Sequence, residues 1–225
     1  MLTLVLTRHG STARSEPEQH LGQHLDVPLS GRGRGEALAL GERLQGLSFH
    51  RIFSSPLLRA RESAALVAPG REAELDARLL EMDYGRWEGL TYGEIEAVDA
   101  AVRRRWEADP ASLACPGGES GEQVARRAGA FLDDLLGWAA SQPRASDATS
   151  AAEHPRVMVV GHSTTNRILL SMALGLPIRD YRRRFAQAPA NLTVLQFTGL
   201  REQGACLMVA NDVAHVRGIR GATWG

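Results

Sequence analysis

The chain has 225 residues, 44% of them hydrophobic, and its 26 basic side chains balance 26 acidic ones. The zero net charge gives no reason to expect nucleic acid or an anionic membrane as a partner. The longest apolar runs fall far short of the ~20 residues that span a bilayer, and no basic segment before a long apolar run marks a signal peptide. The two cysteines form no CxxC motif and predict no disulfide framework, so we expect a cytoplasmic protein.

The first apolar run, Leu2 to Leu6, ends at the tripeptide Arg8-His9-Gly10. A run of this length, rich in Val and Leu, is typical of a buried strand. A polar, irregular segment over residues 11–30 follows. Apolar spacing and the positions of proline then predict, in order, a helix over 32–47, a strand over 51–54, a helix over 56–67, an extended piece over 75–80 and a helix over 91–108.

The second half of the chain begins with a glycine-rich segment, residues 115–120, that follows no strand and lacks the lysine of a P-loop, so we interpret it as a helix start. Residues 141–155 are rich in Ala, Ser and Pro and predict a mobile surface loop. The remaining pattern predicts an amphipathic helix between these segments, a strand over 157–161, a helix over 164–174 and strands over 194–197 and 207–210.

Strands that alternate with helices predict an α/β protein, here a three-layer αβα sandwich. The short connection over 199–205 joins the last two strands as a hairpin, so we expect a central sheet that is mixed and mostly parallel. No change in composition divides the chain, and its length fits one domain over residues 1–225.

Two histidines stand at the ends of predicted strands. His9 follows the first strand, beside Arg8, and His162 follows the strand over 157–161. In open α/β sheets ligands bind outside the carboxyl ends of the strands, so both side chains are expected at one pocket. Arginine donates in a fork to phosphate oxygens, and a neutral histidine can attack phosphorus. The pattern indicates phosphoryl chemistry, although each histidine alone is a weak signal.

Six segments, in order, resemble the motifs of the histidine phosphatase superfamily, whose best-known members are the cofactor-dependent phosphoglycerate mutases. The resemblance extends from about residue 3 to 212 and is to branch 1 of the superfamily. The segments are LTRHGST (6–12), DVPLSGRGRGEALALGERL (26–44), SSPLLRARESA (54–64), LLEMDYGRWEGLTYGEI (79–95), PGGES (116–120) and VVGHS (159–163).

The resemblance implies a phosphomonoesterase that acts on small phosphorylated metabolites and needs no metal or other cofactor. His9 is expected to attack phosphorus and form a phosphohistidine, which water then hydrolyses. Arg8, Arg59 and His162 are expected to bind the phosphate oxygens. Glu81 is expected to protonate the leaving oxygen, because the charge of a phosphate dianion nearby favours the protonated carboxyl group.

Other acids and polar residues lie near these motifs. Asp83 and Glu88 follow Glu81 closely, and Glu88 competes with it for the role of general acid. The expected substrate-binding and pocket-wall residues are Ser15, Gln23, His24, Tyr84, Trp87 and Ser163. Family members usually carry Glu at the position of Ser11 and often Asn at the position of Ser15, and their second motif often reads Ser-His-Gly where this chain has Gly-His-Ser. Both Ser15 and Ser163 can still donate hydrogen bonds to phosphate.

The mutases carry a longer stretch where this chain has residues 90–115, and a basic residue near the position of Tyr92. Both differences favour a hydrolase, with cofactor-dependent phosphoglycerate mutase as the alternative. Arg103, Arg104 and Arg105 argue the other way if they bind an acidic substrate, but they also fit as cations in the last turns of a helix.

Two further classes are weaker. A binding or regulatory module is disfavoured because both histidines, Arg8, Arg59 and Glu81 are present. A metallohydrolase is disfavoured because the sequence has no His-x-His pair and no HExxH motif. Phosphoglycerate, sugar phosphates, phosphoserine and the ribazole phosphate of cobalamin synthesis are all compatible with the sequence as substrates, and so is a homodimer.

Overall fold

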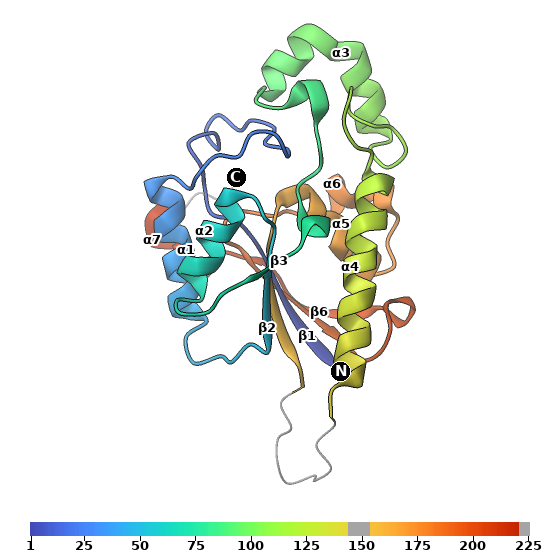
Figure 1. Ribbon diagram of the computed structural model, residues 1–225. Helices are drawn as coiled ribbons and strands as arrows, with labels where there is room; N and C mark the ends of the chain where they lie inside the picture. The colour runs from blue at the N-terminus through green and yellow to red at the C-terminus, as the bar shows by residue number, and fades with distance from the viewer. Residues whose placement is uncertain (144–153, 221–225) are drawn as a thin grey trace.

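The computed structural model describes residues 1–143 and 154–220, and its centre is a six-stranded sheet with helices on both faces (Figure 1). The strands are β1 (Leu2–Arg8), β2 (Arg51–Ser54), β3 (Glu74–Leu75), β4 (Arg156–Gly161), β5 (Leu192–Phe197) and β6 (Ala205–Asp212). Their order is β3-β2-β4-β1-β5-β6. The first four strands run parallel, and β5 pairs antiparallel with both β1 and β6, so the predicted mixed sheet and its final hairpin are confirmed.

The helices form a layer on each face of the sheet and an outlying group beyond its edge (Figure 1). Helices α1 (Gly31–Arg43) and α2 (Leu58–Val67) cover one face, and α4 (Gly121–Ser141) and α5 (Ser163–Ala173) cover the other. Helix α3 (Tyr92–Ala108) lies beyond the sheet. Two short helices, α6 (Tyr181–Arg184) and α7 (Arg217–Arg220), contact α5 and α1 respectively. The three-layer αβα sandwich is thereby confirmed.

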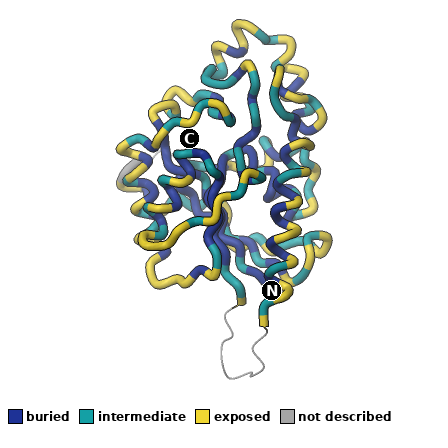
Figure 2. Tube along the Cα trace, in the orientation of Figure 1, coloured by how far each residue is buried: buried dark blue, intermediate teal, exposed yellow. Residues whose placement is uncertain are grey.

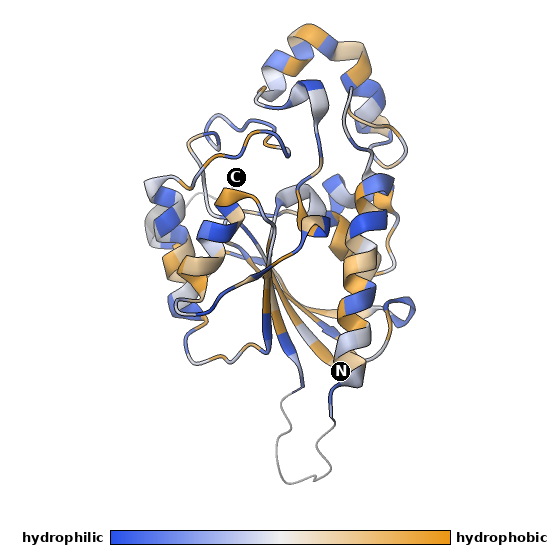
Figure 3. Ribbon diagram, viewed as in Figure 1, coloured by the Kyte–Doolittle hydropathy of each residue, from blue (hydrophilic) through white to orange (hydrophobic). Residues whose placement is uncertain are grey.

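The core lies on both faces of the sheet, where the central strands β1 and β4 are mostly buried (Figure 2) and mostly apolar (Figure 3). Along β1, Leu4 and Leu6 pack toward α4 and α5, whereas Val5 packs toward α1 and α2. Burial of both faces explains why β1 reads as a continuous apolar run and shows no polar alternation.

Several helix and strand ends differ from the prediction for local reasons. Helix α1 ends at Arg43, where the chain turns toward Gly46 with a φ of +84°. Of the predicted extended segment 75–80, only Leu75 belongs to a strand, because Asp76 accepts a hydrogen bond from the backbone of Arg78 and starts a 3-10 turn, η1 (Ala77–Leu79). The predicted helix over 91–108 is present as α3, with a kink at Asp99. Short 3-10 turns also occur at η2 (Gly85–Trp87), η3 (Ile178–Asp180), η4 (Arg201–Gln203) and η5 (Ala214–Val216).

The glycine-rich segment before α4 is a helix start, as predicted. The side chain of Ser120 accepts from the backbone of Gln123, whose own side chain accepts from the backbone of Ser120. This capping box uses the donors that a phosphate cradle would need. The predicted mobile loop over 141–155 falls mainly on residues 144–153, outside the described residues. Among the described residues, no helix combines the length and apolarity needed to cross a bilayer.

Candidate active site

The carboxyl ends of β1 and β4 lie side by side and bring the two predicted histidines together. Arg8 stands opposite Gly161 in the parallel pair, and the backbone N–H of His9 donates to the carbonyl oxygen of Gly161 over 3.0 Å. The rings of His9 and His162 meet edge to face with centroids 5.2 Å apart. The two histidines therefore meet at one point of the sheet, as expected, but only His9 is part of the pocket lining, and His162 lies buried behind it.

One ring nitrogen of His9 is engaged and the other is available for reaction. Nδ1 lies 2.7 Å from the carbonyl oxygen of Gly10. Because a carbonyl oxygen only accepts hydrogen bonds, this contact assigns the proton of the neutral imidazole to Nδ1. Nε2 then keeps its lone pair, which is what attack on phosphorus requires.

Burial and two arginines hold both histidines in the neutral form. Burial lowers the pKa of His9 well below its ordinary value, and the charges of Arg59 and Arg8 lower it further, against a smaller opposing effect of the hydrogen bond to Gly10. Burial also lowers the pKa of His162, followed by the charge of Arg59. A histidine that resists protonation remains a nucleophile in mildly acidic solution.

His162 is completely buried, and neither of its ring nitrogens has a hydrogen-bond partner among the described residues. Leaving a buried polar group unpaired costs about 1–3 kcal/mol, so such groups call for a functional explanation. A phosphoryl group at Nε2 of His9 would bring oxygen acceptors to the neighbouring ring of His162. The unpaired imidazole is therefore suited to bind an anion.

Arg8 lines a surface pocket together with His9. Its Nη1 donates to the carbonyl oxygen of Gln187 over 2.9 Å, and its Nη2 lies 3.5 Å from the half-exposed carboxylate of Glu18. The buried Nε has no partner among the described residues. Arg8 is thus fixed at one end and keeps donors for a ligand at the other.

Arg59 differs from its predicted role in its contacts. It is completely buried, it is not part of the pocket lining, and its Nη atoms donate to the carbonyl oxygens of Leu21, Gly22 and Leu25. Its charge nevertheless acts on both histidines. In this structure Arg59 holds the loop over residues 21–25 and contributes a positive field. Its Nη donors, which were predicted to bind phosphate, are bound to backbone carbonyls instead.

The loop that carries His9 is fastened to α1 and α2. The backbone N–H of Gly10 donates to Oγ of Ser63, and the backbone N–H and hydroxyl of Ser11 donate to the carboxylate of Glu36 over 2.8 and 3.0 Å. A side chain at Gly10 would collide with the backbone of Gly33, so this position requires glycine. Ser11, which departs from the usual family residue, has a dedicated partner in the buried Glu36.

Glu81 is buried and also lines the pocket. Its Oε1 accepts from the backbone N–H groups of Met82 at 2.8 Å and Thr165 at 3.2 Å, and its Oε2 accepts from that of Thr164 at 3.0 Å. Thr164 and Thr165 lie in the first turn of α5, which starts directly after His162. One helix start therefore fixes Glu81 relative to His162.

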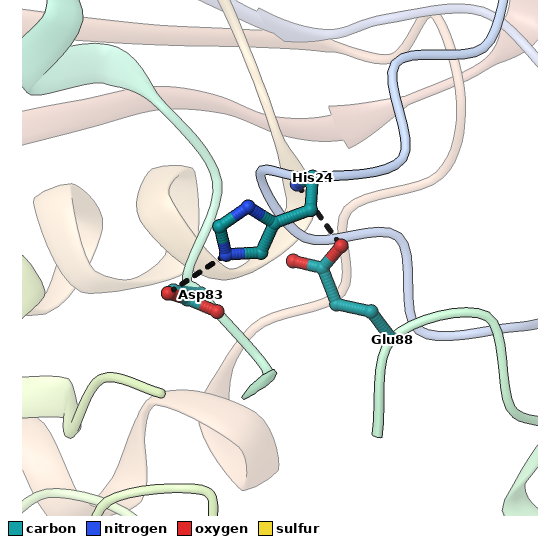
Figure 4. A group of neighbouring side chains, drawn as sticks. All are labelled: His24, Asp83 and Glu88. Carbon is teal, nitrogen blue, oxygen red and sulfur yellow. Dashed lines mark hydrogen bonds and ion pairs between the residues drawn. The ribbon is translucent and has the colours of Figure 1, made fainter. Parts of the chain in front are cut away.

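Glu88 is not part of the pocket lining, and its carboxylate binds backbone N–H groups. Its carboxylate accepts from the N–H groups of Gln23, His24 and Leu25 over 2.6–3.1 Å, and His24 also lies 3.3 Å from Asp83 (Figure 4). Glu81 has as many backbone contacts, but Glu81 lines the pocket and Glu88 does not, so the geometry favours Glu81 as the general acid. The three ionisable groups form the one cluster of metal-ligand type in the described part of the chain, and it contains neither His9 nor His162.

The predicted wall residues divide into two groups. Ser15, Tyr84 and Ser163 line the pocket, as expected. Gln23 does not, because its side chain donates to the carbonyl of Glu81 and to Glu119. Trp87 and His24 are also absent from the lining: Trp87 is buried against Trp106, with its Nε1 donating to Asp99, and His24 is exposed.

The pocket also contains side chains that the sequence did not single out. They are Arg14, Glu18, Gln19, His20, Leu21, Tyr92, Thr164, Arg167 and Arg182. The sequence singled out Tyr92 only because the mutases have a basic residue near this position. Arg103 stacks on the Tyr92 ring at 4.7 Å and donates to the Tyr92 carbonyl oxygen. Arg103 therefore supports a pocket wall, while Arg104 is exposed near Glu96. The one sequence signal for Arg167 is that it is the only charged residue of α5.

Comparison with known proteins agrees with this geometry. A glucosyl-3-phosphoglycerate phosphatase of Mycolicibacterium vanbaalenii is 33% identical over 180 residues, which cover 79% of this chain and 76% of the relative. A probable phosphoglycerate mutase, GpmB, of Salmonella choleraesuis is 30% identical over 219 residues, 96% of this chain and 95% of the relative. The structure of Bacillus stearothermophilus YhfR superposes with a TM-score of 0.81 at 27% identity, over 96% of this chain and all of that one.

The family model that matches residues 4–209 is that of the histidine phosphatase superfamily, branch 1. The match begins in β1 and ends in β6, so it includes both strand ends and both histidines. The six motifs stand in the order expected from the resemblance. The chain belongs to branch 1 of the histidine phosphatase superfamily.

Proposed function

We propose that the protein hydrolyses small phosphomonoesters through a phosphohistidine formed on Nε2 of His9. The observation that carries this proposal is the state of His9: a neutral ring, protonated on Nδ1 by its contact with Gly10, next to Arg8 and beside a buried His162 that has no hydrogen-bond partner among the described residues. Phosphatases are also among its relatives, at 33% identity.

In the first step, the lone pair of Nε2 of His9 attacks phosphorus and the bond from phosphorus to the ester oxygen breaks. Arg8 and His162 stabilise the charge on the equatorial oxygens. The leaving oxygen takes a proton from Glu81, which lines the pocket together with His9. The products of this step are a free alcohol and the phosphorylated enzyme.

In the second step, water attacks the phosphohistidine, the bond from phosphorus to nitrogen breaks, and inorganic phosphate leaves. Glu81, now a carboxylate, accepts a proton from the water and returns to its starting form. The positive charges of Arg8 and Arg59 fill the electrostatic role that metal ions have in other phosphoryl transfers. The mechanism therefore needs no metal.

A hydrolase is preferred to a mutase because of the short segment between residues 90 and 115 and the aromatic Tyr92 in the pocket wall. We further propose that the protein acts in the cytoplasm, since Cys115 and Cys206 are both free thiols in the structure.

The test is a panel of phosphomonoesters assayed for free phosphate, with the conversion of 3-phosphoglycerate to 2-phosphoglycerate measured in parallel. We expect phosphate release from several esters and no mutase activity above a few per cent of the hydrolytic rate. Mutase turnover that exceeds phosphate release would establish the alternative. Absence of phosphate release from every ester, p-nitrophenyl phosphate included, would refute the proposed function.

A further inference from the structure

Two arginines outside the catalytic constellation, Arg167 and Arg182, form part of the pocket wall. Arg167 lies on α5, in the second turn after His162, and Arg182 lies on α6, which contacts α5. Neither belongs to the motifs that carry the family resemblance. Their position raises the question of what negative charge they meet.

Arg167 is a largely buried cation for which the described residues provide no ion pair. Its Nε is buried and has no hydrogen-bond partner within residues 1–143 and 154–220. Burial lowers its pKa, and the charges of Arg8 and Arg182 lower it further. A buried guanidinium without a counterion is unfavourable, and an anion in the pocket would relieve it.

Arg182 is held in place by aromatic rings. Its Nη2 donates to the hydroxyl of Tyr92 over 3.1 Å, and its guanidinium lies 4.7 Å from the centre of the Trp106 ring. The guanidinium of Arg103 in turn stacks on the ring of Tyr92. Rings orient a guanidinium well but do not neutralise it, so Arg182 also keeps a full charge for a ligand.

Arg167 and Arg182 lie in the same pocket as the proposed site of phosphoryl transfer and add positive charge to that pocket. Arg8, His9, Arg167 and Arg182 line the same pocket, and the charge of Arg8 acts on both His9 and Arg167. Arg8, His162 and the field of Arg59 already serve one phosphoryl group in the proposed mechanism. The second pair of arginines exceeds that need.

We infer that Arg167 and Arg182 form a second anion subsite, which binds a negatively charged group on the alcohol part of the substrate. The preferred substrates are then phosphomonoesters whose alcohol carries a carboxylate or another anion, and esters of neutral alcohols are poorer substrates. This inference rests on the proposed function, since it names the substrate class for the same pocket. The forked donors of arginine suit a carboxylate in particular.

A matched pair of compounds isolates the second charge. 3-Phosphoglycerate and glycerol 3-phosphate share the phosphorylated carbon and the neighbouring hydroxyl, and they differ in a carboxylate against a hydroxymethyl group. We expect kcat/KM to be higher for 3-phosphoglycerate by about ten- to a hundredfold, the range of one or two charge-assisted hydrogen bonds. Arg167→Gln and Arg182→Gln should each reduce that ratio by about tenfold, and Arg167→Lys should reduce it less.

The control is Arg183→Gln, which removes a neighbouring arginine whose side chain is 78% exposed and paired with Asp180. It should leave the ratio unchanged, which separates a subsite from a general loss of positive charge. Circular dichroism of each variant confirms that it is folded. Equal kcat/KM values for both compounds in the wild type would overturn the inference. So would an equal loss on both compounds in Arg167→Gln, which would assign Arg167 to the phosphoryl group itself.

Calorimetric binding of the same two compounds gives a readout that does not depend on turnover. Tighter binding of 3-phosphoglycerate, lost in Arg167→Gln, supports the subsite even when hydrolysis is slow. Equal or undetectable binding of both compounds refutes it. Hydrolysis of p-nitrophenyl phosphate by the wild type, measured alongside, shows whether the proposed function itself holds, so the failure of one conclusion is distinguishable from the failure of the other.

Discussion

The imidazole of His9 meets that of His162 edge to face, at an interplanar angle of 61°. Two protonated rings with centroids 5.2 Å apart would repel each other. Burial, together with the charges of Arg59 and Arg8, already lowers the pKa of each histidine. The pair is therefore neutral before substrate arrives, and the reactivity of His9 does not wait for a base to remove a proton.

The pH dependence of turnover follows from this neutrality. Nε2 of His9 is protonated only when pH falls through its lowered pKa, so the acidic limb of kcat/KM should lie well below pH 6.5. The measurement uses p-nitrophenyl phosphate from pH 4 to 8, corrected for the ionisation of the substrate. An acidic limb centred near pH 6.5 would show that the folded protein does not shift His9.

Replacement of the nucleophile should abolish activity. His9→Ala removes the attacking nitrogen and little core volume, so we expect kcat to fall by a factor on the order of 10⁴ or more while the protein stays folded. Wild-type protein quenched rapidly with radioactive substrate should carry an acid-labile, base-stable label that the variant lacks. His50→Ala, which alters an exposed histidine before β2, should behave as wild type. A labelled and active His9→Ala protein would move the nucleophile elsewhere.

The role of Glu81 can be separated from that of a structural acid by the choice of leaving group. Glu81→Gln should slow hydrolysis of an alkyl phosphate by about 10²- to 10⁴-fold and that of p-nitrophenyl phosphate much less, because the phenolate leaves without a proton. Glu88→Gln should lower stability without this selectivity, since Glu88 binds the backbone of residues 23–25. Equal losses on both substrates in Glu81→Gln would reassign Glu81 to positioning.

Metal removal should have no effect on turnover. The proposed mechanism relies on arginine and histidine for positive charge. Dialysis against EDTA is therefore expected to leave kcat within about twofold of its starting value. Vanadate, which adopts the five-coordinate geometry of the transferring phosphoryl group, should inhibit competitively. Loss of activity in EDTA that zinc or magnesium restores would count against the mechanism.

His20 links the pocket wall to the stability of the fold. Burial lowers its pKa from 6.5 to about 4, against a smaller opposing effect of its hydrogen bond to Leu90. The unfolded chain then binds the proton more readily, so the free energy of unfolding should fall as pH drops from about 6.5 to about 4. His20 alone accounts for about 3 kcal/mol of this change.

Urea unfolding at pH 7, 5.5 and 4.5 measures this dependence. His20→Gln should flatten the pH dependence across the window, whereas His50→Gln should not. An unchanged slope in His20→Gln would show that other groups dominate the acid sensitivity of the fold.

The sequence was most informative where chemistry coincides with the end of a strand. His9 and His162 could be placed together because a buried parallel strand ends at each, and parallel strands end at one edge of a sheet. Only the family resemblance favoured Glu81 over Glu88. Spacing alone does not show which of the two carboxylates accepts hydrogen bonds from the backbone N–H groups of residues 23–25.

Other features depend on orientation, which spacing does not encode. Gln23 was expected in the pocket wall, but the carbonyl of Glu81 and the carboxylate of Glu119 take its donors. Arg59 was expected to donate two hydrogen bonds to phosphate, but its Nη atoms donate to the carbonyl oxygens of Leu21, Gly22 and Leu25. Arg167 and Arg182 were missed because their direction follows from how α5 and α6 meet, a tertiary contact between short helices.

The strand that carries the nucleophile lies between two strands that come much later in the chain. β1 pairs with β4 on one side and with β5 on the other, and the backbone of Arg8 is bonded to Asn191, 183 residues further along. While the ribosome is still making residues 156–197, the histidine of β1 has neither its carbonyl anchor at Gly161 nor its partner ring. The pair of His9 and His162 can therefore form only after residues 156–162 have been synthesised, and the hydrogen bond from the backbone of Arg8 only after Asn191.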